Sequence, residues 1–142
     1  MRFKNLKVMA SAAVLSCGVG FAQAEVAVVV HPSNAAVLDA GEVAKLFLGK
    51  ASKFPGGAAA TPIDLAEGDA SRDEFHAKVT SKDAGQLKSY WSRLVFTGKG
   101  QPPRTVASDA DVISAVAADP TAIGYVDSSA VTGDVKVVLT VN

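Results

Sequence analysis

The pattern of apolar and polar positions predicts strands that alternate with helices. Val26–Val30 is a continuous apolar run, mostly β-branched, that ends at His31-Pro32. Such a run is typical of a strand buried on both faces, as in a parallel sheet between helices. Further strands are predicted at 61–65, 122–126 and 135–139.

Helices are predicted between these strands. Asp39 can cap a helix that extends to about Leu48, and Ser71 can cap one that extends to about Thr80, with Glu74 completing a capping box. Residues 83–96 form a longer helix, and a last one begins at Ser108 and stops at 119–120. The side chains expected to face inward are Val43, Leu46, Phe47, Phe75, Val79, Leu87, Trp91, Leu94, Val95, Val112, Ile113 and Val116. This order predicts one α/β layered domain with a mostly parallel sheet flanked by helices.

The first 24 residues have the organisation of a cleaved signal peptide. A basic start is followed by an apolar stretch at 8–21, which is too short to span a bilayer, and then by Ala22-Gln23-Ala24. We therefore expect a secreted, periplasmic domain at 25–142. The segment that ends at Cys17 loosely resembles a lipobox, so a lipoprotein is the less favoured alternative.

Charge and composition exclude several classes of function. The chain has 14 basic and 14 acidic residues, and three of the basic ones lie in the leader, so the mature domain has a net charge of −3. This sign argues against a nucleic-acid partner. One cysteine and two histidines argue against disulfides and metal centres, and no nucleophile–base motif or phosphate loop is present. We expect no enzyme activity, cofactor or metal.

One strand-to-helix turn is a candidate anion site. Its residues are Gly68, Asp69, Ala70, Ser71 and Arg72. The amino terminus of a helix offers free N–H groups and the positive end of its dipole, and a hydroxyl and a guanidinium would complete the site. The alternative is a purely structural role, in which Ser71 only caps the helix and Arg72 is a solvated charge.

The remaining candidates are assigned structural roles. His31 follows a buried strand and His76 lies within a helix, and each stands alone in the sequence. The aromatic residues Tyr90, Trp91 and Phe96 are expected in the core. The acidic helix start at Ser108 would repel an anion.

Three segments resemble periplasmic phosphate-binding proteins of ABC transporters. Val26–Pro32, followed by the helix end Leu46-Phe47-Leu48-Gly49-Lys50, looks like that family's strand and "IF-x-GK" motif. Glu67–Phe75 resembles its Ser-Gly-Thr-Arg anion loop, and Ala118–Val126 is similar to its late strand. The three stand in family order and together span most of the mature chain.

The resemblance implies a periplasmic binding protein-like (type II) lobe that binds phosphate or a similar oxyanion. Ser71 stands where the family has a threonine and Arg72 where it has an arginine, while Ala70 and Asp69 replace a glycine and a serine. The Asp69 carboxylate would repel a dianion, or would select a protonated oxyanion by accepting its proton. The chain also has about one lobe's length, whereas the family clamps phosphate between two lobes.

Two functions follow from these observations. The first is a secreted solute-binding protein for phosphate or a related oxyanion that delivers it to an ABC permease, with a homodimer as one way to rebuild the cleft. The alternative is a degenerate, phosphate-binding-like interaction module that docks on an envelope partner without a transport role.

Overall fold

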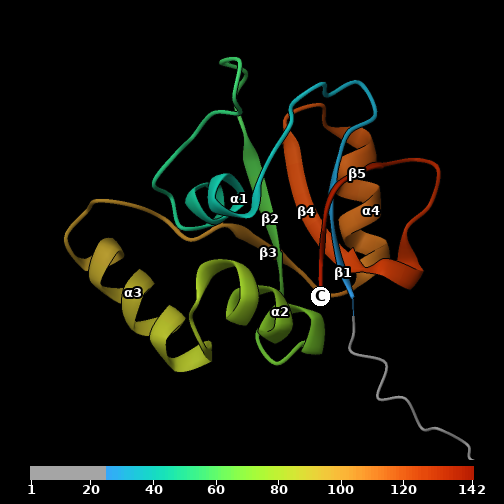
Figure 1. Cartoon of the computed structure of the whole chain (residues 1–142). Coiled ribbons are helices and arrows are strands. Elements are labelled where there is room, and N and C mark those ends of the chain that lie inside the picture. The colour runs from blue at the N-terminus through green and yellow to red at the C-terminus, as the bar shows by residue number, and fades with distance from the viewer. Residues whose placement is uncertain (1–24) are drawn as a thin grey trace, which may run out of the picture.

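The computed structural model describes residues 25–142 (Figure 1). The predicted signal peptide at 1–24 and the lipobox alternative at Cys17 lie outside the described residues. Within residues 25–142, no helix has the length and apolar character needed to cross a membrane.

Five strands form one sheet in the order β3-β2-β4-β1-β5. β2 runs parallel to β3 and β4, whereas β1 is antiparallel to both β4 and β5. The α/β fold is confirmed, but the sheet is mixed rather than mostly parallel, because the apolar run of β1 reports burial on both faces and carries no information on strand direction. The strands are β1 (Val26–Val30), β2 (Thr61–Leu65), β3 (Arg104–Val106), β4 (Ala122–Asp127) and β5 (Lys136–Val141).

Helices cover both faces of the sheet, as two neighbouring residues of β4 show. A Cβ added at Gly124 would lie only 2.6 Å from Val112 Cγ1 of α4. Tyr125 points to the other face, where its ring packs against Phe47 of α1 and Phe75 of α2. The helices are α1 (Ala40–Phe47), α2 (Ala70–Phe75), α3 (Ala84–Phe96) and α4 (Asp109–Ala118), with a π-helical turn at His76–Thr80 and a 3₁₀ turn at Ser128–Ala130.

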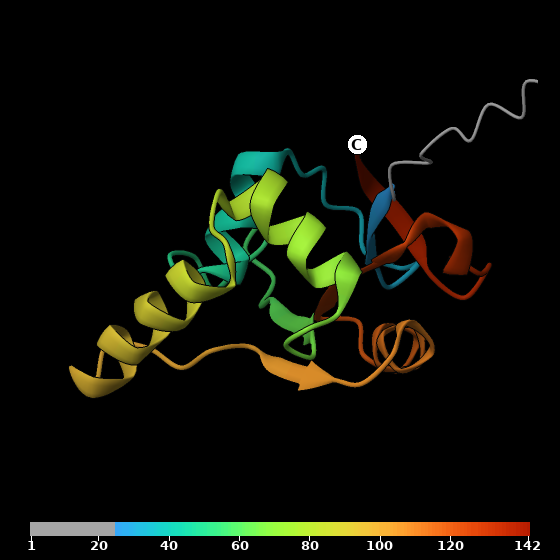
Figure 2. The same ribbon diagram turned by 90° about the horizontal axis from the view of Figure 1, so that it is seen from below.

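Helix α3 lies apart from the main hydrophobic core. It packs through a small cluster of Leu48, Leu87 and Trp91, and the Tyr90 hydroxyl donates to the Leu48 carbonyl oxygen at 2.6 Å. Figure 2 shows α3 projecting from the rest of the molecule.

The outer end of α3 departs from the prediction. Val95 is 44% exposed and Phe96 is 93% exposed, although Val95 was expected to face inward and Phe96 to lie in the core. Helical spacing correctly places Leu87 and Trp91 on a buried face. Helical spacing does not say whether another element covers the last turn of a helix. Within residues 25–142, no element covers the last turn of α3. The short strand β3 was also not predicted, because Arg104–Val106 is too short to show a strand pattern.

Candidate functional site

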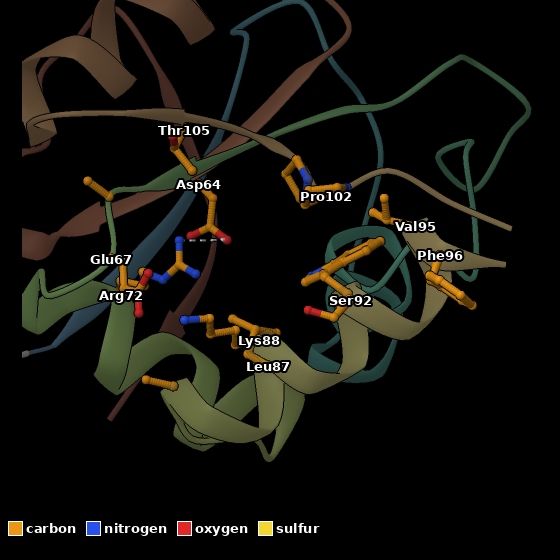
Figure 3. A pocket seen from close by; sticks show the side chains of 14 residues that line it. Asp64, Glu67, Arg72, Leu87, Lys88, Ser92, Val95, Phe96, Pro102 and Thr105 are labelled. Carbon is orange, nitrogen blue, oxygen red and sulfur yellow. Dashed lines mark ion pairs between the residues drawn. The ribbon is translucent and has the colours of Figure 1, made fainter. Parts of the chain in front are cut away.

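A pocket of about 730 Å³ lies beside the carboxyl end of β2, between α2 and α3 (Figure 3). β2 contributes Asp64, α2 contributes Arg72, and β3 contributes Thr105. The opposite wall comes from α3 and from the loop that follows it, including Pro102 and Pro103. The carboxyl end of a sheet strand is a common place for a ligand in open α/β folds.

Arg72 is fixed at the edge of this pocket. Its Nη1 donates to the Leu65 carbonyl oxygen at 2.7 Å and lies 3.8 Å from Asp64 Oδ2, and the side chain is 16% exposed. A guanidinium has five N–H donors in a rigid fork. Among the described residues, Nη1 alone has a protein acceptor, so the remaining donors are free to meet an anion in the pocket.

Asp64 is the buried carboxylate that holds this arrangement together. Its Oδ1 accepts hydrogen bonds from the Leu65 amide (2.9 Å) and from the Tyr125 hydroxyl, and its Oδ2 lies 3.0 Å from His76 Nε2. A buried charge is tolerated only when it is paired and hydrogen-bonded, and Asp64 meets this condition. Its oxygens are therefore occupied and do not offer a free acceptor to a ligand.

His76 is not the isolated histidine that the sequence suggested. The Thr80 hydroxyl donates to the His76 carbonyl oxygen, so Thr80 Oγ1 can only accept from His76 Nδ1, at 3.0 Å. Nε2 faces the Asp64 carboxylate at 3.0 Å, so the ring bridges Thr80 and Asp64. Sequence spacing could not reveal this pair, because Asp64 and His76 lie on different elements.

Tyr125 closes the network from β4. Its ring stacks on Phe75 with centroids 3.9 Å apart. Burial and the adjacent Asp64 carboxylate raise the pKa of the Tyr125 phenol well above its usual range. The phenol thus stays protonated and serves as a fixed donor to Asp64.

The predicted anion loop is only partly brought to the pocket. Of its residues Arg72 lines the pocket, whereas Gly68, Asp69, Ala70 and Ser71 do not. Asp69, not Ser71, is the N-cap of α2, and its Oδ1 accepts from the amides of Ser71 (2.8 Å) and Arg72 (3.4 Å). The capping role assigned to Ser71 and its capping box with Glu74 are wrong, because α2 begins at Ala70 and Ser71 lies inside its first turn. Gly68 has φ +94° and allows the turn before the helix.

Lys88 is a pocket cation that the sequence reasoning missed. It lies on α3, one turn after Ala84, and lines the pocket opposite α2. Within residues 25–142 it makes no ion pair with an acidic group. The charged lining residues Asp64, Glu67, Arg72 and Lys88 balance in formal charge. In the same range, no group of histidine, cysteine and acidic side chains is placed to hold a metal ion.

Proteins of phosphate ABC transport are among the solved structures that this chain resembles. It matches a phosphate ABC transporter substrate-binding protein from Clostridium perfringens, solved with bound phosphate, at TM-score 0.62 and 22% identity, over 81% of this chain and 45% of that one. It matches an ABC-type phosphate transport receptor from Vibrio cholerae at TM-score 0.63 and 14% identity, over 81% and 46%. PstS from Borrelia burgdorferi matches at TM-score 0.53 and 17% identity, over 74% and 42%.

These similarities establish the fold. The chain matches no family model, and no curated protein sequence is significantly similar to it. It spans less than half the length of the solved structures that it matches. The chain therefore resembles phosphate ABC transporter substrate-binding proteins in structure and has their periplasmic binding protein-like α/β fold.

Proposed function

We propose that the protein is a secreted, non-enzymatic solute-binding protein for phosphate or a related oxyanion, associated with an ABC transporter in the periplasm. The observation that carries this proposal is the Arg72 guanidinium, which is held by the Leu65 carbonyl oxygen beside a pocket. The phosphate receptors that share the fold support it.

Arg72 is the principal anion-binding residue in this proposal. Asp64 and the Leu65 carbonyl orient its guanidinium before a ligand arrives, so little side-chain entropy is lost on binding. Gly68, Asp69, Ala70 and Ser71 build the turn that sets the position of Arg72. The Asp69 carboxylate already occupies two of the helix amides, which leaves more of the anion's stabilisation to side chains.

The test is calorimetric titration of the purified protein with inorganic phosphate at low salt, with sulfate as competitor. We expect saturable binding that Arg72→Ala abolishes. Arg93→Ala is the matched control, because Arg93 is exposed on α3 and does not line the pocket. Circular dichroism would show that both variants are folded. Undiminished binding in Arg72→Ala would contradict the assignment of the site.

A second function is favoured by the exposure of Phe96. Phe96, which is 93% exposed, lies next to the half-exposed Val95, and the two side chains offer an apolar surface at the end of α3 to another protein. In this alternative the domain is an interaction module that docks on an envelope partner. A partner captured from envelope extracts by the wild type and by Val37→Ser, but not by Phe96→Ser, would support it. Capture that is the same for all three would count against it.

A further inference from the structure

The pocket beside Arg72 has two chemically different ends. One holds the guanidinium of Arg72 and the amine of Lys88, and the other is apolar. Figure 3 shows the Lys88 side chain directed into the same space as the Arg72 guanidinium. The apolar end is formed by α3 and the loop after it, through Leu87, Trp91, Val95, Pro102 and Pro103.

The size of the pocket does not suit a bare inorganic ion. Its volume of about 730 Å³ lies within the roughly 300–1,000 Å³ of sites that bind organic ligands. A single phosphate ion at Arg72 would occupy a small part of this space. Val95, which is 44% exposed, would then remain in contact with water, whereas Leu87 and Trp91 are already largely buried.

The charge of the pocket leads to the same conclusion. Arg72 and Lys88 are offset by Asp64 and Glu67 in the lining, so the net field on a dianion is weak. Asp64 is also engaged with Arg72 itself, at 3.8 Å. Because charge alone supplies little affinity, contact with the apolar wall would contribute a large share of it.

We propose that this pocket binds an organic oxyanion, with its anionic group at Arg72 and Lys88 and an aromatic or aliphatic group against Trp91 and Val95. This inference rests on the proposed function, in which Arg72 binds an oxyanion, and narrows its ligand class. Burial of apolar ligand surface against this wall adds to the affinity in proportion to the area removed from water. The ligand class is therefore a small phosphate monoester, or another small molecule that joins an oxyanion to an apolar group.

The experiment is calorimetric titration of the purified protein with inorganic phosphate, methyl phosphate and phenyl phosphate in the same buffer. The two esters have the same anionic group, so a difference between them reports the apolar wall. We expect phenyl phosphate to bind about tenfold more tightly than methyl phosphate. Benzyl alcohol, which has the ring without the anion, should not bind measurably.

Trp91 gives a direct report on where the ligand lies. It is the single tryptophan of the chain and it lines the pocket. We expect phenyl phosphate to change its fluorescence with the same midpoint as the calorimetric titration. Val95→Ser should weaken phenyl phosphate about threefold and leave methyl phosphate unchanged. Val37→Ser is the matched control, since Val37 is exposed and lies outside the pocket.

The outcomes separate this inference from the proposed function. Equal binding of all three phosphates, lost in Arg72→Ala, would overturn the organic ligand and leave the oxyanion receptor standing. Tight binding of phenyl phosphate that survives Arg72→Ala would overturn the inference, because the ring alone would then account for it. The absence of binding by any of the three would contradict both proposals.

Discussion

The two apolar clusters of residues 25–142 differ in what surrounds them. Around β1 and β4, helices on one or both faces of the sheet exclude water, and Phe75 and Tyr125 are fully buried. Around α3, three buried residues carry the contact, and the helix continues beyond them to the exposed Phe96. Apolar side chains in the first region stabilise the fold. Apolar side chains at the outer end of α3 contribute little to stability and are exposed to a ligand or a partner.

The largest expected effect is a contrast between two phenylalanines. Phe75→Ala removes a ring that packs against Phe47 and Tyr125, and should lower the free energy of unfolding by about 3–5 kcal/mol. Phe96→Ala should change it by less than about 0.5 kcal/mol, because the side chain is already in water. Urea denaturation measures both values. A similar loss of unfolding free energy in the two variants would show that the end of α3 is buried to the same extent as the face of the sheet.

Hydrogen exchange should separate the two clusters in the unmodified protein. We expect amides of α3 to open locally and exchange at least about tenfold faster than those of β1, because few buried contacts hold the helix. Leu87→Ala should accelerate exchange along α3 and have a much smaller effect on β1. If Leu87→Ala accelerated both equally, the two clusters would open as one cooperative unit.

The smallest effect concerns the two tyrosines, one in each region. Burial raises the pKa of Tyr90 and raises that of Tyr125 further, where Asp64 adds to it. A tyrosine whose folded pKa exceeds its unfolded value of about 10 contributes stability that is present below that pH and lost as pH rises above it. Absorbance at 295 nm should therefore show Tyr90 ionising first, and Tyr125 only on alkaline unfolding.

Tyr90→Phe is the control for this titration. It should remove the first step and leave the second at the pH of unfolding. If the first step persisted in Tyr90→Phe, Tyr125 would be ionising in the folded protein, and its hydrogen bond to Asp64 would be weaker than the geometry indicates.

The sequence alone determined the local elements. Within residues 25–142, apolar spacing located all four α-helices and four of the five strands, because side-chain periodicity follows from the geometry of one element. The cap predicted at Asp39 is confirmed at the start of α1, whereas the capping box predicted at Ser71 is not formed. The three resembling segments indicated the fold, which the solved structures of phosphate receptors bear out.

The tertiary structure decided what each element contacts. The pairing of Asp64 with His76 and Tyr125 joins three elements, and no periodicity within one element encodes it. The exposure of Phe96 and the position of Lys88 depend on where α3 rests, and the direction of β1 depends on its neighbours in the sheet. Arg72 was named from the sequence, but its orientation comes from the Leu65 carbonyl oxygen and Asp64. Local pattern fixes the shape of an element, whereas a site is built by contacts between residues that are distant along the chain.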